Sequence, residues 1–162
     1  MRNLVTILTE EGMMTLLQKS ENVSLPLCAE DKDLILDLKN FIKNNDGLGM
    51  SAIQLGSTKN IFVMKKPWNS NNLIAVINPK ITRKEGSSVK VEGCFSIPTP
   101  KNTGALVKRA QQIFVEFYNE SGELISNELF IGIDARVFQH EFDHLKGELM
   151  INKNKFQGWS EV

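Results

Sequence analysis

The amino-acid sequence predicts an α+β fold in which mostly antiparallel strands accompany one early and one late helix. Two observations support this class: short β-type runs fill the middle of the chain, and apolar residues recur at helical spacing near its beginning and end. The length of 162 residues favours one domain, so residues 1–162 are expected to form a single unit. No internal repeat or low-complexity linker divides the chain.

The early helix is predicted over residues 31–44. Its apolar side chains follow helical spacing at Leu34, Ile35, Leu38, Phe41 and Ile42. Asparagines and Gly47 then end it. The late helix is predicted over residues 136–146, with Gly147 at its end.

Four runs predict strands: residues 61–64, 73–77, 113–118 and 124–131. The polar segment 119–123 lies between the last two runs and indicates a hairpin turn. Residues 1–28 are hard to assign to any element, and residues 152–162 show little helical pattern.

Composition excludes several classes of protein. Hydrophobic residues make up 41% and charged residues 23%, which is typical of a globular protein. Lys plus Arg and Asp plus Glu both number 19, so a generally basic nucleic-acid binder is disfavoured. No apolar run approaches the ~18 residues of a membrane span, and early acidic residues interrupt any signal-peptide core. We expect a soluble protein of a reducing compartment, without nucleic-acid or membrane partners.

Charge is balanced overall but not locally. Residues 10–37 contain seven acids and two bases, whereas residues 80–109 contain seven bases and two acids. These segments are either solvated or mutually packed faces, or the second is a basic rim that guides an anionic partner.

The late helix contains His140-Glu141-Phe142-Asp143-His144, which includes both histidines of the chain. Residues i and i+4 share a helix face, so both imidazoles can bind one metal ion. Glu141 can then act as a general base on a water molecule at that metal. The alternative is that both rings lie on a helix surface without a metal.

A catalytic metal site of this kind needs a third protein ligand. No histidine follows His144, and the upstream candidate is Cys94, which follows Gly93. The alternative for an isolated cysteine is a small buried apolar residue. We expect that alternative for Cys28, which lies between Leu27 and Ala29.

The segment 47–56 contains paired glycines and Gln54. The glycines either end a helix in a turn or let backbone groups approach an extended peptide. The segment lacks the Gly-Lys-Ser/Thr ending of a phosphate-binding loop. The Gln54 amide is suited to donate a hydrogen bond to a developing oxyanion.

Together these three segments resemble the peptide deformylase family, whose motifs read Gly-x-Gly-Leu-Ala-Ala-x-Gln, Glu-Gly-Cys-Leu-Ser and His-Glu-x-Asp-His. In this chain they occur in the same order as Gly47-Leu48-Gly49-Met50-Ser51-Ala52-Ile53-Gln54, Glu92-Gly93-Cys94-Phe95-Ser96 and His140-Glu141-Phe142-Asp143-His144. The resemblance covers about residues 31–150. It implies mostly antiparallel sheets around a central metal-binding helix.

The resemblance also implies an activity. Family members remove the N-formyl group from the initiator methionine of newly made polypeptides and release formate. Cys94, His140 and His144 would bind one divalent metal ion, Fe(II) by family expectation, with Zn, Ni or Co also possible. One thiolate and two imidazoles suit several such ions, so the sequence does not select among them.

By the same resemblance, Glu141 would take a proton from the attacking water and pass it to the leaving amine. The metal, the Gln54 amide and the Phe95 backbone N–H would stabilise the oxyanion. Leu48 and Gly49 would offer backbone groups to the substrate. The Leu48 side chain would also border the pocket for the methionine side chain.

Two further hydrophobic residues, Ile133 and Val137, would border that pocket, or belong to the ordinary core. Glu92 and Arg109 would form a pair that orients the Cys94 loop, or a surface pair. Lys101 would contact the peptide.

The departures from the family motifs are modest: Met50, Ser51 and Phe95 stand where Leu, Ala and Leu are usual. The short tail after His144 leaves ribosome docking open. Two other functions stay open, a catalytically weak homologue that binds formyl-Met peptides and a structural zinc module. The expected location is the cytoplasm, or an equivalent reducing compartment with formyl-Met translation, including a phage-infected host.

Overall fold

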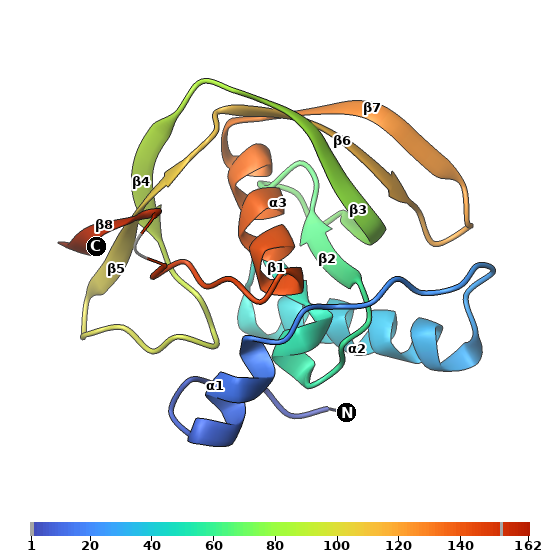
Figure 1. Ribbon diagram of the computed structural model, residues 1–162, viewed down its shortest axis with the longest axis horizontal. Helices are drawn as coiled ribbons and strands as arrows, with labels where there is room; N and C mark the ends of the chain where they lie inside the picture. Colours follow the sequence, from blue (N-terminus) through green and yellow to red (C-terminus); the bar gives the residue numbers. More distant parts are fainter. Residues whose placement is uncertain (1, 153) are drawn as a thin grey trace.

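The computed structural model describes residues 2–152 and 154–162 (Figure 1). Its helices are α1 (Glu10–Leu16), α2 (Ala29–Asn45), the short 3₁₀ helix η1 (Ala52–Leu55) and α3 (Gly132–Leu145). Its strands are β1 (Gly49–Ser51), β2 (Ile61–Lys65), β3 (Leu73–Glu85), β4 (Ser88–Glu92), β5 (Thr103–Arg109), β6 (Gln112–Tyr118), β7 (Leu124–Ile131) and β8 (Phe156–Glu161). The predicted α+β class, with mostly antiparallel strands around a central helix, is confirmed.

The strands form two antiparallel sheets. One has the order β1-β2-β3-β6-β7, and the other has the order β4-β5-β8. Figure 1 shows α3 in the middle, below the long strands β3, β6 and β7, with the smaller sheet at one side and α2 and α1 below. Because β1 and β4 are edge strands of different sheets, each has one side free of a strand partner.

Helix α3 is fixed by its apolar face. Phe138 is fully buried, and its ring lies 5.0 Å from that of Phe62 and 5.1 Å from that of Phe130. Burying an aromatic side chain of this size contributes up to about 3 kcal/mol. This packing sets the rotation of α3, and therefore the direction in which its opposite face points.

The predicted elements are found, with differences at their ends. Helix α2 matches the prediction within two residues, and the strand expected at 73–77 continues to Glu85. The predicted hairpin between β6 and β7 is confirmed, with Gly122 at φ 81°. The late helix begins at Gly132, four residues earlier than predicted. Its start was hard to predict because the N-cap residue, Ile131, has no side chain that can cap the helix.

The expectation for Cys28 was wrong. Cys28 is exposed, and it stands at the N-cap of α2, where its backbone N–H donates to the Asp31 carboxylate at 3.0 Å. Its neighbour Leu27 enters the core instead. Among the described residues, no helix has both the length and the apolar character needed to cross a membrane.

Candidate metal centre and active site

The structure brings together the three side chains selected as metal ligands. His140 and His144 lie one turn apart on α3, with ring centroids 5.1 Å apart, on the side away from Phe138. The loop after β4 supplies Cys94, whose Sγ lies 3.3 Å from Nε2 of His144. One ligand atom from each of these three residues lies within 4.8 Å of the other two.

A tight turn holds Cys94 in this position. Its carbonyl oxygen accepts a hydrogen bond from the backbone N–H of Ile97 at 3.1 Å. Ile97 is itself buried in a core cluster with Leu16 and Met150. The cysteine therefore sits on a short loop anchored on one side by β4 and on the other by the core.

The donor set fits one transition-metal ion. Burial, together with the charge of nearby His140, lowers the pKa of His144 well below its ordinary value, so that ring stays neutral as a metal ligand must. Within the described residues, the buried Nδ1 of His144 has no hydrogen-bond partner. A sulfur and two imidazoles leave a coordination position for substrate or water, as in catalytic sites. The cluster therefore fits a single metal ion.

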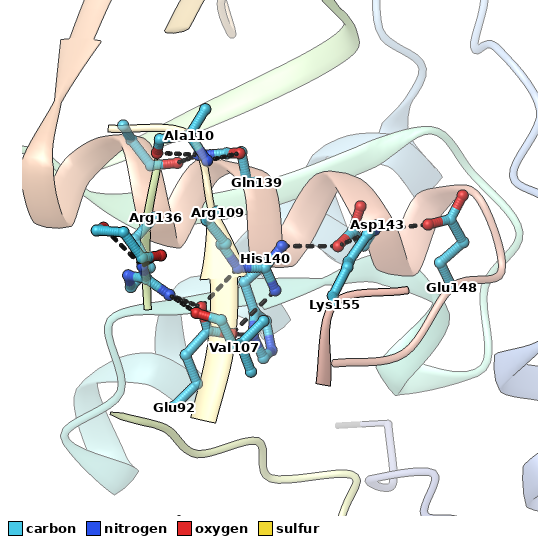
Figure 2. Close-up of polar contacts among 12 residues, drawn as sticks. Glu92, Val107, Arg109, Ala110, Arg136, Gln139, His140, Asp143, Glu148 and Lys155 are labelled. Atoms are coloured by element: carbon cyan, nitrogen blue, oxygen red, sulfur yellow. Dashed lines mark hydrogen bonds and ion pairs between the residues drawn. The ribbon is translucent and has the colours of Figure 1, made fainter. Parts of the chain in front are cut away.

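Glu92 holds the other ligand on α3. Its Oε2 lies 2.9 Å from Nδ1 of His140, which leaves Nε2 of that ring for the cluster. Arg109 donates to both carboxylate oxygens, at 2.5 and 2.9 Å, and Arg136 donates to Oε1 at 2.7 Å (Figure 2). Burial alone would raise the pKa of Glu92, but hydrogen bonds from His140 and Arg109 hold it well below its usual range. The predicted pairing of Glu92 with Arg109 is confirmed.

The polar network continues toward the C-terminal segment (Figure 2). Arg109 also donates to Asp143 at 2.7 Å, and Lys155 lies 2.7 Å from the same carboxylate. Lys155 further donates to Glu148 at 2.6 Å. The residues before β8 are thus tied by charge to α3, one residue from His144.

Glu141 places a carboxyl group beside the cluster. It is buried, and its Oε2 has no hydrogen-bond partner in the described part of the chain. Burial raises the pKa of Glu141 to about 7, against the opposing effect of His140 and Arg109. A carboxyl group with this pKa can both take and release a proton near neutrality. Gly49 makes room for it, because a Cβ there would lie 2.7 Å from Oε1 of Glu141.

Gln54 is oriented by Ser51. Its Oε1 accepts hydrogen bonds from both the backbone N–H and the hydroxyl of Ser51, each at 3.0 Å. Because a backbone N–H can only donate, the facing atom must be the amide oxygen. The amide Nε2 therefore points to Ser96, at 3.1 Å, and toward Cys94, at 3.6 Å. The Ser51 that departs from the family motif thus fixes the amide donor in the site.

These residues lie in a cleft of about 600 Å³. The predicted site residues that line it are Leu48, Gly49, Gln54, Cys94, Phe95, Ile133, Val137, His140 and Glu141. His144 does not line the cleft and is buried behind it. Phe95 is partly exposed, and its ring meets Phe41 edge-to-face at 5.2 Å. A partly open, largely apolar cleft with a few polar groups is typical of a ligand site.

Two charged residues of this cleft, Lys90 and Arg136, were not predicted from the sequence. Arg136 lies one helical turn before His140, so the i, i+4 spacing on α3 could have revealed it. Lys90 lies two positions before Glu92 on β4, a strand that was not predicted. The predicted peptide contact Lys101 is not among the residues that line the cleft.

Comparison with known proteins gives the family. A sequence model of the family described as polypeptide deformylase matches residues 3–158. This chain belongs to the polypeptide deformylase family. The peptide deformylase of Thermotoga maritima is 37% identical over 132 residues, which span 79% of this chain and 76% of that protein.

Solved structures of this family share the fold. The crystal structure of peptide deformylase from Thermotoga maritima has a TM-score of 0.84 at 31% identity and covers 98% of this chain and 99% of its own. A probable peptide deformylase from synechococcus phage S-SSM7 has a TM-score of 0.80 at 32% identity, covering 93% of this chain and 98% of its own. The chain is accordingly a metal-dependent hydrolase of the deformylase family, which removes the N-formyl group from the N-terminal methionine of newly made polypeptides.

The two other functions are not favoured. A structural zinc site is closed by four ligands. In the described residues the Cys/His group contains only Cys94, His140 and His144, whereas Cys28 is exposed at the start of α2. A catalytically weak binding homologue has no need for a buried carboxyl group beside the cluster, yet Glu141 is there.

Proposed function

We propose that residues 1–162 form one catalytic domain in which Cys94, His140 and His144 bind a divalent ion, Fe(II) by family expectation. The observation that carries this proposal is the cluster of one sulfur and two imidazole nitrogens within 4.8 Å of one another. When bound, such an ion supplies Lewis-acid chemistry: it polarises a carbonyl oxygen and makes water more acidic.

The substrate is an N-formyl-Met nascent peptide in extended form. Edge strands β1 and β4 border the cleft, so backbone groups of Gly49 and the β4 side can pair with it. Leu48, Ile133 and Val137 surround the methionine side chain. Their apolar surfaces suit an unbranched thioether.

Glu141 moves the proton. It takes a proton from the attacking water as the new C–O bond forms at the formyl carbon. It then gives that proton to the amine nitrogen as the C–N bond breaks, which releases formate and a free N-terminus. The Gln54 amide Nε2 and the backbone N–H of Phe95 donate to the oxygen on which negative charge develops. Each such donor contributes about 3–4 kcal/mol to the transition state.

The enzyme acts in the cytoplasm or in an equivalent reducing compartment where translation starts with formyl-Met, such as a phage-infected host cell. A cysteine that stays a free thiol, as Cys94 does, is typical of such a reducing compartment.

The test is formate release from formyl-Met-Ala-Ser by protein purified without oxygen or loaded with nickel. We expect turnover that depends on the metal and stops when the metal is removed by a chelator. Turnover no greater than that of Glu141→Ala would reject the enzymatic role. Binding of the peptide without formate release would instead favour the binding homologue.

A further inference from the structure

The cleft wall contains an exposed positive charge that the deformylation chemistry does not use. The described residues with charged side chains along the cleft are Lys90, Glu92, Arg136 and Glu141. Glu92, Arg136 and Glu141 are buried, whereas Lys90 is exposed. A peptide entering this cleft therefore meets the Lys90 ammonium group at the surface.

The register of β4 points Lys90 toward the cleft. Alternate residues of a strand share a face, so Ser88, Lys90 and Glu92 lie on the same side. Arg136 donates to the Ser88 hydroxyl at 3.1 Å and to Glu92 at 2.7 Å, which fixes that side as the one facing α3. Lys90 leaves the strand between these two contacts.

Three of the six other bases in the segment 80–109 have ion-pair partners, and the other three, Lys84, Lys101 and Lys108, do not line the cleft. Lys80 lies 3.7 Å from Glu116, Arg83 lies 2.9 Å from Glu85, and Arg109 is buried against Glu92. Lys90 makes no ion pair or side-chain hydrogen bond with any residue that the structure describes. Of the two carboxyl groups in the cleft wall, Glu92 is already paired with Arg109 and Arg136, and Glu141 is buried and makes no ion pair with Lys90.

The distance along β4 indicates which part of a substrate Lys90 would meet. Two residues span about 7 Å along a strand, and Glu92 contacts the metal-ligand candidate His140. An extended peptide with its formyl group at the Cys94–His140 cluster would have its second residue about level with Lys90, because peptide residues advance at the same rise. The flexible lysine stem can reach the second or the third residue.

We propose that Lys90 is a specificity-determining residue. It favours nascent chains with an acidic side chain at the second or third residue, where formyl-Met is the first. This inference rests on the proposed function. It gives the basic segment 80–109 a specific role, through one lysine, in attracting an anionic partner.

The test compares peptide pairs that differ only in charge: formyl-Met-Asp-Ser with formyl-Met-Asn-Ser, and formyl-Met-Ala-Asp with formyl-Met-Ala-Asn. In at least one pair we expect kcat/KM to be about two- to fivefold higher for the acidic peptide, the range of a solvent-exposed ion pair. The difference should lie mainly in KM and should shrink as salt is added.

Two variants test the assignment to Lys90. Lys90→Met keeps the apolar stem and removes the charge, so the Asp/Asn ratio should fall to about one, whereas Lys90→Glu should invert it, because like charges repel. The matched control is Lys108→Met on β5, an exposed lysine outside the cleft, which should keep the wild-type ratio. The Asp/Asn ratio of kcat/KM is taken within each variant, so a change in a variant's overall rate does not affect the comparison.

The inference is overturned by equal kcat/KM within both wild-type pairs, or by a preference that survives Lys90→Met. If no formate is released, that result counts against the proposed function and not against the role of Lys90. A binding measurement then tests Lys90 without turnover. Calorimetry with the deformylated pairs, Met-Asp-Ser against Met-Asn-Ser and Met-Ala-Asp against Met-Ala-Asn, should then show tighter binding of the acidic peptide to wild type in at least one pair and equal binding to Lys90→Met. Equal affinities for wild type within both pairs would contradict the role of Lys90.

Discussion

Glu92 and His140 are joined by a contact of 2.9 Å between Oε2 and Nδ1, and this contact connects the three-stranded sheet to helix α3. The carboxylate comes from the end of β4 and the imidazole from α3. A carboxylate on one ring nitrogen fixes the tautomer and direction of the other, so Glu92 acts on the cluster through His140. Arg109 and Arg136 in turn hold Glu92 in its ionised form.

Glu92→Gln should destabilise the protein, because it leaves the buried guanidinium group of Arg136 without its counter-charge and that of Arg109 with Asp143 alone. The expected loss in the free energy of unfolding is about 3–5 kcal/mol. Urea unfolding measures it, with Glu85→Gln as the matched control. Glu85 pairs with Arg83 at the surface, so that change should cost less than about 1 kcal/mol. Similar losses in the free energy of unfolding for both variants would show that the buried network stabilises the protein no more than a surface ion pair does.

Glu141→Gln should lower kcat about 10²- to 10⁴-fold, the usual contribution of a positioned proton-transfer group. The metal content should be unchanged, because Glu141 is outside the ligand cluster. Formate release and metal analysis on the same sample test both statements. Glu120→Gln, in the hairpin between β6 and β7, serves as the control and should keep wild-type turnover. A Glu141→Gln protein that loses its metal would make Glu141 a ligand instead.

Gly49→Ala should reduce turnover while leaving the cluster in place. A methyl group there would press on the Glu141 side chain at 2.7–3.0 Å and force it to move. A shift of about 1 Å in a catalytic group can cost about 100-fold in rate. We expect a lower kcat with the metal content of wild type. Wild-type kcat in this variant would contradict the close placement of Glu141 against β1.

Asp31→Asn should remove a contribution to stability that depends on pH. Burial would raise the pKa of Asp31, but hydrogen bonds from Lys59 and Cys28 make the net shift downward. A lowered carboxyl pKa contributes stability above the unfolded value, about 3.9, and this is lost as pH falls through the folded pKa. Wild type should therefore be more stable than the variant at pH 7, and the difference should be lost at a pH below the lowered pKa of Asp31.

Urea unfolding at both pH values checks this prediction. Asp33→Asn is the control on the same helix, since Asp33 is exposed and has no ion pair within the described residues. That change should stay within about 0.5 kcal/mol at either pH. A difference between wild type and Asp31→Asn that persists at low pH would rule out the ion pair as its source.

The helices and strands predicted from sequence are those whose apolar residues form a run long enough to indicate the element by itself. Helix α2 and strand β6 have apolar side chains at a regular period, β2 is a continuous apolar run, β7 has apolar residues at both ends, and each was found. Strand β4 was not predicted, although residues 88–92 alternate polar and apolar side chains; in the structure its apolar side chains, Val89 and Val91, are exposed and not in the core. Strand β8 contains Gly158 at φ 122° and forms by pairing with β5, which is distant in sequence.

The metal cluster was predictable because its residue types are rare in this chain and carry specific chemistry. The residues around the metal cluster were harder to predict from the sequence. Gln54 was selected as a donor, but its orientation depends on Ser51, and the network of Arg136 and Lys155 depends on contacts across the fold. Helix α1 has seven residues, too short to form by itself, and was missed because its stability comes from tertiary packing, as for buried Leu16.

The central claim is that a cysteine after β4 and two histidines on α3 bind the same ion, and the most direct measurement is the number of metal ions per chain. Cobalt-loaded wild type should hold one ion per chain and show a sulfur-to-metal charge-transfer band. Cys94→Ala should lose that band and most of the metal, while Cys28→Ala should keep both. One tightly bound ion per chain in Cys94→Ala, with the wild-type spectrum, would contradict the account.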